Sequence, residues 1–435
     1  MKAPDYDVIV IGGGPAGMMA AASAAERGAS VLLLEKNPEP GRKLLLSGGG
    51  RCNFTNVEPD VHRLTARYGA AGKSLISPFS KMGPREVLEF FASRGMPHKV
   101  EDNGRAFPAT NKAESVLKVL LAEMRTHGVK IRTGATVDAL LVNGSIPANR
   151  EVHGVRLGST RITARTVITA AGGLAYPETG STGDGFRWMQ RCGHSIVHPE
   201  PSLVPVIVHE PWIAELQGLA FPEIRIAVLA GGRVLERVTG KILFTHFGLS
   251  GPGILNLASR IADAAASNPD KPVRISLDFF PEDDGGSLDR HLQQLFAAAP
   301  KRKLKNLLDE LLPPRLTARI LAAAVDTGTT SITDIASITG SSVPRQLRKR
   351  LVQLMQDFRV TYKGLQSEDW AIVSRGGIPC NEIDFRTMQS KLVSGLYAVG
   401  DMLDINRPSG GYSLQICWAT GFVAGCAAAA QARSR

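Results

Sequence analysis

The first 35 residues carry the pattern that most constrains how this chain can fold. A short apolar run at residues 7–11 leads directly into GGGPAG at residues 12–17, which has the spacing G-x-G-x-x-G. An alanine-rich stretch then runs to Gly28, and a second apolar run at residues 30–34 is followed by Glu35. A strand, a glycine turn, a helix and a second strand in this order predict the first βαβ unit of a parallel sheet.

The glycine turn has the chemistry of a dinucleotide site. Gly12 permits the tight turn, Gly14 lets the backbone approach a pyrophosphate, and Gly17 allows the helix to pack closely on the strand. The helix that begins around Ala16 directs its free N–H groups at the phosphates. Glu35 follows Gly17 by eighteen residues, where a carboxylate can accept hydrogen bonds from a ribose hydroxyl. The unit therefore predicts dinucleotide binding rather than a merely flexible turn.

The far end of the chain favours FAD over NAD as this dinucleotide. Residues 395–401 read GLYAVGD, a predicted strand that ends in Gly400 and Asp401. This is the form of a second FAD fingerprint, in which the aspartate binds the ribityl chain or approaches the pyrophosphate through water. The sequence holds no second G-x-G-x-x-G, so NAD(P)H, if used, is expected to dock transiently at the flavin.

Three further glycine loops are predicted to touch the cofactor. Residues 47–53 read SGGGRCN and residues 170–173 read AAGG, so both offer backbone that a flavin ring or a diphosphate can approach. Residues 407–415, RPSGGYSLQ, lead into a final predicted helix whose N-terminus would stabilise negative charge on the reduced flavin. Positive charge near the diphosphate is expected from Arg42, Lys43 and Arg51.

The middle of the chain has a different texture. Short β-branched segments between residues 203 and 279 predict a small β-barrel or sandwich, and the leucine-rich stretch 285–354 predicts helices. Strands are expected at 129–132, 152–157, 161–169, 203–208, 224–229, 233–238, 241–244 and 273–279, and helices at 84–94, 112–127 and 416–430. Because nucleotide-binding patterns occur at both ends, the middle segments are predicted to be insertions into a discontinuous nucleotide domain.

Composition excludes several classes of protein. The 435 residues are 43% hydrophobic and 21% charged, which is typical of a globular protein with a large core. The N-terminus has no basic segment followed by an apolar one, and residues 416–430 are too short and too rich in small residues to span a bilayer. We therefore expect no secretory signal and no membrane partner. Five scattered cysteines without C-x-x-C predict neither disulfides nor a metal site and fit a reducing cytoplasm: Cys52, Cys192, Cys380, Cys417 and Cys426.

The net charge of +11 is unevenly distributed. Residues 285–360 hold twelve Lys and Arg against six Asp and Glu, so this segment contributes +6. The densest cation clusters are at 301–305 and 345–350. One interpretation is an ordinary solvated helix surface, and the other is a site for an anionic macromolecule such as RNA.

Motifs along nearly the whole chain resemble the BaiN-like (YhiN-like) family of FAD flavoproteins, also labelled aminoacetone-oxidase-family enzymes. They are GGGPAG at 12–17, EK at 35–36, GRK at 41–43, SGGGRCN at 47–53, AAGG at 170–173, GSTGDG at 180–185, GGIPCNEID at 376–384, TMQSK at 387–391 and GGYSLQ at 410–415. The resemblance implies an α/β architecture. It comprises a Rossmann-like FAD-binding domain at 1–198 and 372–435, an inserted β-barrel domain at 199–284 and 356–371, and an inserted helical domain at 285–355.

The motifs and the resemblance together define the predicted cofactor-binding residues. These are Gly12, Gly14, Ala16, Gly17, Glu35, Lys36, Arg42, Lys43, Ser47, Gly48, Gly49, Arg51, Asn53, Val137, Ala171, Gly172, Gly173, Gly400, Asp401, Gly410, Gly411, Tyr412, Ser413 and Leu414. The chain departs from the family at residues 406–408. The family has Asp-Gly followed by a variable residue, whereas this chain has Asn406, Arg407 and Pro408, and this difference could alter substrate choice.

The resemblance also suggests a reaction. Some members of the family are linked to reduction of a uridine in large-subunit ribosomal RNA to dihydrouridine, which needs a hydride and a nearby acid. Cys52 is the candidate acid, although packing beside the flavin is the favoured interpretation; Cys380 is a weaker rival and His246 is expected to be structural. We predict an FAD-dependent oxidoreductase driven by NAD(P)H. The alternatives are an amine or ketone oxidase using O₂ and a flavin-binding RNA-associated factor without turnover.

Overall fold

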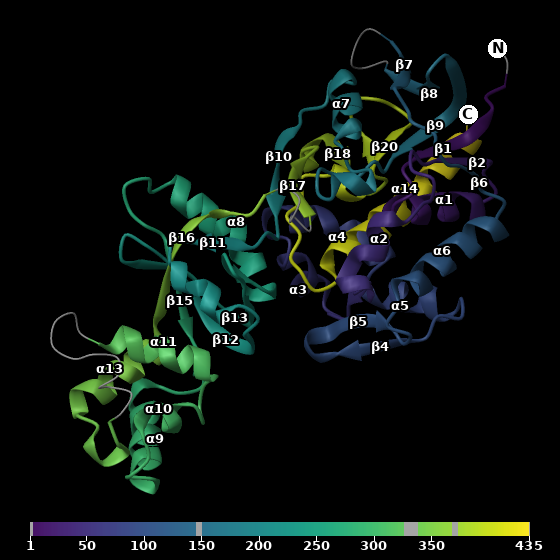
Figure 1. Ribbon diagram of the computed structural model, residues 1–435. Helices are drawn as coiled ribbons and strands as arrows, with labels where there is room; N and C mark the ends of the chain where they lie inside the picture. Colours follow the sequence, from purple (N-terminus) through teal and green to yellow (C-terminus); the bar gives the residue numbers. More distant parts are fainter. Residues whose placement is uncertain (1–2, 145–149, 326–337, 368–372, 435) are drawn as a thin grey trace. The chain divides into compact units, whose positions relative to one another are not determined.

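The computed structural model describes residues 3–144, 150–325, 338–367 and 373–434. Contacts between residues divide the chain into two compact units, and the ribbon in Figure 1 is coloured by residue number so that their segments can be followed. The first unit comprises Met1–Ser202 and Glu368–Arg435, and the second comprises Leu203–Ser367. Two stretches of the expected insertions, 326–337 in the helical one and 368–371 in the barrel, lie outside the described residues.

A parallel sheet forms the centre of the first unit. Its strands lie in the order β20-β9-β1-β2-β6, and β1 pairs in parallel with both β2 and β9. Their bounds are β1 Tyr6–Ile11, β2 Val31–Leu34, β6 Lys130–Arg132, β9 Thr160–Thr169 and β20 Leu396–Ala398. The sheet continues beyond β20 into β19 Gln389–Ser390 and β18 Ile383–Asp384, while β8 Glu151–Leu157 and β7 Ala139–Asn143 extend from β9. The predicted α/β class is therefore confirmed.

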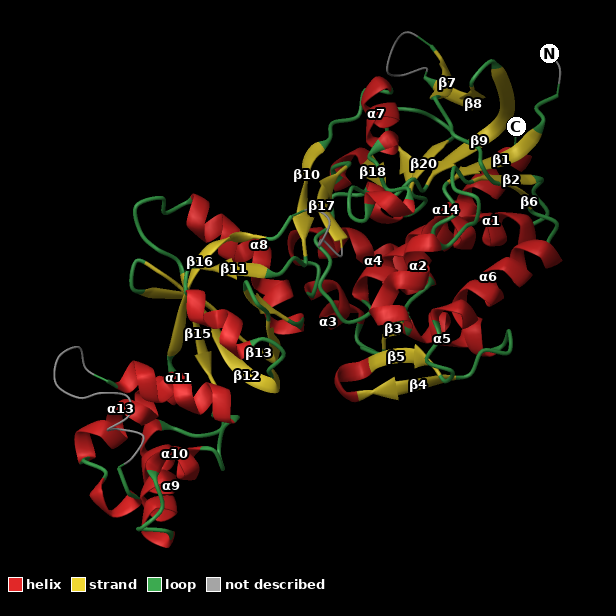
Figure 2. Cartoon of the chain, viewed as in Figure 1, coloured by secondary structure: helices red, strands yellow, loops and turns green. Residues whose placement is uncertain are grey.

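Two helices rich in small residues pack on this sheet and on each other. They are α1, Pro15–Glu26, and α14, Tyr412–Arg433, which lie side by side in Figure 2. A Cβ atom built on Gly421 or Gly425 of α14 would lie 2.4 Å from the Ala16 carbonyl oxygen or 2.3 Å from that of Ala20. These glycines are required because the backbones of the two helices touch.

The length of α14 corrects one expectation. The helix has 22 residues rather than the fifteen expected at 416–430, because it begins at the glycine loop. It is long and apolar enough to cross a membrane, but 67% of its most apolar window is buried inside the folded unit. The apolar composition of α14 is thus accounted for by its position in the core of the protein.

Smaller elements of the first unit surround the sheet. The helices are α2 Arg42–Leu46, α3 Val61–Ala66, α4 Gly72–Lys81, α5 Pro84–Ala92, α6 Ala113–Thr126 and α7 Asp184–Arg191. Three short strands, β3 Thr55–Asn56, β5 Arg105–Pro108 and β4 His98–Glu101, form a separate antiparallel sheet. A further antiparallel pair joins β10 Val197–Ser202 to β17 Val373–Gly377.

The second unit contains a closed antiparallel barrel, not an open sandwich. The strand order is β11-β14-β13-β12-β15-β16. The bounds are β11 Val206–Val208, β12 Ala220–Ala230, β13 Arg233–Phe244, β14 Gly248–Ser250, β15 Arg274–Asp278 and β16 Phe358–Leu365. The two strands expected at 233–238 and 241–244 are in fact one. Gly240 lies inside it, where a Cβ would meet Gly253 of the adjacent helix at 3.1 Å, so the glycine serves packing rather than a turn.

Helices complete the second unit. They are α8 Pro252–Ala266, α9 Gly285–Ala298, α10 Leu304–Leu308, α11 Pro314–Ala324 and α13 Arg345–Gln356. The leucine-rich segment behaves as expected, since Leu304, Leu307 and Leu308 are fully buried. The apolar side chains of these helices form a core, whereas cations such as Lys301, Arg345 and Lys349 are exposed.

Candidate functional site

The predicted cofactor loops meet at one edge of the parallel sheet. The strands β1, β2, β9 and β20 all end there, and they are followed by Gly12, Glu35, Ala170 and Gly400 respectively. In open α/β sheets, ligands bind outside the carboxyl ends of the strands. The fold therefore gathers loops that are almost 400 residues apart in sequence.

The glycine turn after β1 combines tight packing with one open position. Gly12 has φ +107°, and a Cβ there would lie 2.3 Å from the Ala170 carbonyl oxygen. A Cβ on Gly17 would lie 1.9 Å from the Gly12 carbonyl oxygen, whereas one on Gly14 would meet nothing within 4 Å. Gly12 and Gly17 are thus required by the protein's own packing, and Gly14 leaves room for a ligand to approach the N-terminus of α1.

Glu35 is fixed by the same turn. Its side chain is buried, and Oε2 accepts a hydrogen bond of 2.7 Å from the Gly13 N–H. Oε1 accepts from the backbone and side-chain nitrogens of Asn37 at 2.8 and 2.7 Å. The Ala135 N–H donates to the Glu35 carbonyl, so the segment holding buried Val137 runs beside it. A carboxylate has lone pairs beyond those three bonds, which leaves Glu35 able to accept a ribose hydroxyl.

The expected cations differ in what they contact. Lys36 Nζ lies 2.9 Å from Asp184 Oδ2 and 2.6 Å from Thr182 Oγ1, which ties β2 to the loop before α7. Arg42 is exposed and donates to Asn37 Oδ1 at 3.2 Å. The basic side chains near the turn are therefore partly engaged by protein groups.

The AAGG loop after β9 is held closely on both sides. A Cβ on Gly172 would lie 2.7 Å from Ser181 Oγ, and one on Gly173 would lie 2.2 Å from Ser374 Oγ. Ala171 is partly buried against the same core. This loop thus brings β17 and the 180–185 segment against the carboxyl end of β9.

Asp401 forms a charged triad with Lys43 and Arg407. Lys43 Nζ lies 3.4 Å from Asp401 Oδ2, and Arg407 Nε lies 3.4 Å from Oδ1. Burial would raise the pKa of Asp401, but the two cations outweigh it and hold the pKa below its ordinary value. Asp401 is accordingly charged at neutral pH.

Arg407 is a structural residue, which corrects its expected effect on substrate choice. Its side chain is only 1% exposed and donates to the carbonyls of Ser374, Gly400 and Leu403 at 3.3, 2.9 and 3.0 Å. A guanidinium that is covered in this way cannot touch a substrate. It holds the loop after β20 in place.

The SGGGRCN loop exposes a row of backbone. Gly48, Gly49 and Gly50 have φ values of +58°, +67° and +82°, and a Cβ on Gly49 or Gly50 would meet nothing within 4 Å. Ser47 Oγ donates to the Leu44 carbonyl at 2.6 Å. Asn53 Oδ1 is buried and has no hydrogen-bond partner among the described residues. The loop offers both open backbone and an unused acceptor.

The Gly410–Gly411 turn lies directly against this loop. A Cβ on Gly411 would fall 2.9 Å from Asn53 Oδ1 and 2.5 Å from the Thr55 carbonyl. Thr55 Oγ1 donates to Gln415 Oε1 at 2.6 Å although 360 residues separate them. Tyr412, Ser413 and Leu414 form the first turn of α14 at this point. The two loops thus make one surface.

Cys52, within the 47–53 loop, is fully buried. The thiol is 0% exposed, and burial raises its pKa to about 12, although Ser47 opposes the shift. Its φ of +59° is uncommon for a residue with a side chain. Because protein atoms cover the thiol completely, a reacting molecule cannot contact it without movement of the loop.

The two rival residues lie elsewhere. Cys380 lines a surface cavity of about 1010 Å³ beside α4, and burial raises the pKa of its thiol to about 11. Its sulfur lies 3.5 Å from the Asp404 carbonyl oxygen. His246, in the second unit, is exposed and contacts the ring of Phe247, and its expected structural role stays a prediction.

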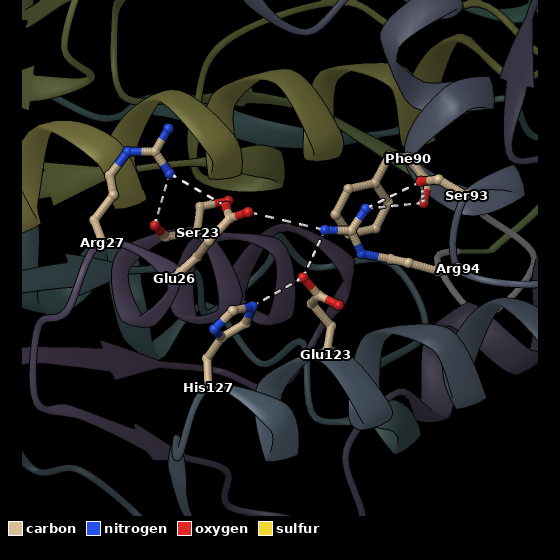
Figure 3. A network of polar contacts seen from close by, with 8 residues as sticks. All are labelled: Ser23, Glu26, Arg27, Phe90, Ser93, Arg94, Glu123 and His127. Carbon is tan, nitrogen blue, oxygen red and sulfur yellow. Dashed lines mark hydrogen bonds and ion pairs between the residues drawn. The ribbon is translucent and has the colours of Figure 1, made fainter.

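A second polar cluster in the first unit has metal-ligand chemistry but contains its own cation. The ligand atoms of Glu26, Glu123 and His127 lie within 4.8 Å of one another. Figure 3 shows the Arg94 guanidinium between the two carboxylates, 2.6 Å from Glu123 and 4.0 Å from Glu26. Hydrogen bonding from Arg94 keeps the pKa of Glu123 below its ordinary value. The network joins α1 to α6, and we assign it a structural role.

The residues at the sheet edge fit FAD. Open backbone at Gly14 and Gly49 gives room for a pyrophosphate and a ring, and the buried Oδ1 atom of Asn53 has no hydrogen-bond donor among the described residues. Ribityl and ribose hydroxyls would supply such donors. Sequence reasoning missed Ser374, Arg407 and Gln415 as supports of this site. Of these three residues, only Gln415 belonged to a motif, GGY-x-LQ, that indicated a role in the site. The motif did not indicate which residue Gln415 contacts.

Comparisons with known proteins agree with this geometry. The family described as HI0933-like protein Rossmann domain matches residues 6–427. The chain is 31% identical over 405 residues to the 3-dehydro-bile acid delta(4,6)-reductase of Clostridium scindens, which covers 92% of this chain and 93% of that protein. It is 28% identical over 415 residues to the ribosomal RNA dihydrouridine synthase of Escherichia coli, with coverages of 95% and 96%.

A solved structure shares the fold at low identity. The 3-ketosteroid delta1-dehydrogenase from Sterolibacterium denitrificans has a TM-score of 0.55 and 15% identity, covering 98% of this chain and 99% of that one. At this identity the likeness concerns architecture alone.

Proposed function

Because this chain belongs to the HI0933-like Rossmann-domain family of FAD-dependent oxidoreductases, we propose that it is a reductase driven by NAD(P)H. The candidate substrate is a uridine of large-subunit ribosomal RNA. The observation that carries the proposal is the continuous surface made by residues 47–53 and the Gly410–Gly411 turn. The name of the Escherichia coli relative, which matches over almost the full length of both chains, supports the RNA substrate.

The proposed cofactor contacts divide between the two ends of FAD. Gly12, Gly14, Gly17 and Glu35 would hold the pyrophosphate and the adenosine ribose. Asn53 would accept a hydrogen bond from the remainder of FAD, because its Oδ1 is buried without a donor among the described residues. Asp401 is proposed as a second acceptor, beside the Arg407 guanidinium that lies 3.4 Å from its Oδ1. When bound, FAD supplies hydride transfer at N5.

The chain's own groups then control charge and access. The N-terminus of α14 begins at Tyr412 and would stabilise negative charge on the reduced ring. Saturation of the uridine ring also needs a proton on the carbon next to the one that receives hydride. We propose a packing role for Cys52, since its protonated thiol is sealed from reactants; the alternative role as acid requires the 47–53 loop to open.

The RNA contact is proposed for the basic surface of the second unit. Hydrogen bonds from Gly340 to Arg302 and from Ser341 to Pro300 place the 301–305 cluster beside the segment that leads into α13. Arg348 is paired with Asp289 at 2.7 Å, so it is a poor phosphate ligand. In the 301–305 and 345–350 clusters, the exposed cations with neither an ion pair nor a side-chain hydrogen bond to a described residue are Lys301, Lys303, Arg345 and Lys349, whereas exposed Arg350 donates to Gln353 Oε1 at 2.9 Å. These four are the side chains best able to release counterions on binding.

Anaerobic single-turnover experiments test the proposal. NADPH or NADH should bleach the flavin of the purified holoprotein, and a ribosomal RNA fragment should restore its absorbance with formation of dihydrouridine. Reoxidation by O₂ coupled to amine or ketone oxidation, with no response to RNA, would favour the oxidase alternative. Absence of reduction by either nucleotide would favour a factor without turnover. Heat-released cofactor should run as FAD, and FMN would contradict the assignment of both fingerprints.

The RNA surface has a matched test. Replacing Arg345 and Lys349 with glutamine should weaken RNA binding across sequences and lower the salt slope by about two, without a change in flavin content. Replacing Arg348 should weaken binding much less because of its ion pair. If wild-type protein shows no salt-dependent affinity for ribosomal RNA, these helices present only a solvated surface.

A further inference from the structure

Three cations converge on a single carboxylate in the small sheet of the first unit. Glu101, at the end of β4, contacts Arg51 Nη2 and lies 3.3 Å from Lys99 Nζ and 3.7 Å from Arg105 Nη2. We call Arg51, Lys99, Arg105 and Glu101 the β4–β5 cluster. Its side chains are 38%, 41%, 38% and 27% exposed in that order, so all four reach solvent.

The charges of this cluster do not balance. Among the described side chains of this cluster, three cations and one acid leave a net charge of +2, and like charges a few ångströms apart repel. Partial desolvation would raise the pKa of Glu101, but Lys99 and Arg51 hold it below its ordinary value, so it remains a carboxylate. An ion pair with a purely structural role would need only one cation for Glu101. The charge of the other two cations is not neutralised by Glu101 and is available to a bound anion.

The cluster is also held in position. The β4 and β5 strands pair in register, with Glu101 opposite Arg105 and Lys99 opposite Phe107. The Arg51 guanidinium stacks at 4.0 Å from the centre of the Phe107 ring. Ordered cations lose less conformational freedom when an anion binds, which favours binding.

Its neighbours are the two loops proposed to flank the flavin. Arg51 belongs to the 47–53 loop itself. Asn56 Nδ2 donates to the carbonyl of Asn103, in the β4–β5 turn, at 3.0 Å and to that of Gly410 at 3.2 Å. The hairpin therefore contacts the 47–53 loop through Arg51 and is linked to Gly410 through Asn56.

We propose that the β4–β5 cluster binds a phosphate of the nucleotide that docks at the flavin surface. This inference rests on the proposed function for the position of the flavin. Two sources offer the same chemistry, namely the phosphates of a nicotinamide dinucleotide and the backbone of an RNA strand. Glu101 holds the cations in position, and the phosphate neutralises the positive charge that Glu101 does not balance.

Binding to the oxidised holoprotein tests the inference without turnover. NADP⁺, NAD⁺ and a labelled single-stranded oligouridylate are titrated into wild type and into the double variant Lys99→Gln/Arg105→Gln. The Kd of the bound source should rise about 5- to 30-fold, from two exposed charge contacts. For the oligonucleotide, the salt slope should also fall by about two. The control double variant Lys118→Gln/Arg161→Gln removes one exposed Lys and one exposed Arg from other elements and should leave each Kd within twofold.

Glu101→Gln separates a phosphate site from a structural network. It raises the local charge of the described side chains to +3, so affinity should increase, whereas a purely structural network would give a lower melting temperature and no change in affinity. A loss confined to NADP⁺ and NAD⁺, or confined to the oligouridylate, identifies the source. The inference is overturned if wild type binds none of the three ligands or if Lys99→Gln/Arg105→Gln changes none of the constants. Flavin content, measured on the same samples, reports independently on the flavin site that the proposed function requires.

Discussion

Replacing Arg407 with methionine isolates the contribution of the buried charge behind the flavin site. Methionine keeps the length and most of the apolar stem of the side chain while removing the guanidinium. The change deletes hydrogen bonds to the carbonyls of Ser374, Gly400 and Leu403 and the 3.4 Å ion pair with Asp401. Asp401 is only 13% exposed, so it is left largely buried with Lys43 as its remaining cation.

Removal of one partner from a buried ion pair typically costs about 3–5 kcal/mol, because the other charge stays behind uncompensated. We therefore expect Arg407→Met to lower the free energy of unfolding of the first unit by about 3–5 kcal/mol. The loop at Gly400 should also loosen, which weakens FAD binding. Arg386→Met is the control, because that arginine pairs with Asp384 on the surface at 82% exposure and should have a far smaller effect.

The free energy of unfolding that is lost in Arg407→Met should depend on pH in a defined direction. In wild type the pKa of Asp401 is held below its ordinary value, so its charge stabilises the fold above that value and the contribution is lost as pH falls through the folded pKa. Without Arg407, burial has less opposition and Asp401 takes up its proton at a higher pH. The difference in stability between wild type and Arg407→Met should therefore narrow as pH falls from 7 towards 4.

Urea unfolding followed by tryptophan fluorescence, to which buried Trp418 contributes, measures this difference at each pH. Flavin fluorescence reports release of the cofactor in the same samples. A difference that stays constant between pH 7 and pH 4 would show that the triad does not control Asp401. An effect no larger than that of Arg386→Met would show that Arg407 is not a buried structural cation.

The other predictions concern the cofactor loops and the helix pair. Glu35→Ala should weaken FAD binding by about 1.5–3 kcal/mol, the range for a hydrogen bond to a charged group, measured by titration of the apoprotein; unchanged affinity would remove Glu35 from the site. Gly49→Val should abolish flavin binding through its positive φ and the side chain placed in open space, with the barrel still folded by circular dichroism. Cys52→Ala should retain flavin and most of kcat if Cys52 only packs, whereas a large fall in kcat with full flavin content would establish the acid. Gly425→Ala usually strengthens a helix, but here it should destabilise by about 1–3 kcal/mol because its Cβ would overlap the Ala20 carbonyl; a rise in melting temperature would contradict the packing of α14 on α1.

Local patterns in the sequence predicted a large part of this protein. The βαβ unit, the second fingerprint and the glycine loops led to an α/β fold with a Rossmann-type domain, and the family match confirms the resemblance that those motifs indicated. The barrel was also expected, although β13 was divided in two. The sequence pattern could not show that Gly240 permits contact with α8. The position of α8 against β13 is set by tertiary packing and not by the residues next to Gly240 in the chain.

The site was predicted in outline and completed by tertiary contacts. Motifs identified which loops hold the cofactor, but not the supports behind them. An arginine in a glycine loop is typically a surface residue, and nothing within the RPSGGYSLQ segment indicates that Arg407 is covered on all sides. The same applies to Lys99 and Arg105, which belong to no motif and acquire a shared site only when β4 pairs with β5.

The physical distinction is the range of the interactions involved. Strand periodicity, glycine spacing and helix ends depend on residues within a few positions of one another, so the order of the letters is sufficient to predict them. Contacts such as Lys43–Asp401 and Thr55–Gln415 join residues 358 and 360 positions apart, and they exist only because four strands end at one edge of a sheet. Burial of charge, the pKa of Asp401 and the cation cluster on Glu101 follow from that assembly of distant segments, because electrostatics depends on distance in space and on exclusion of water.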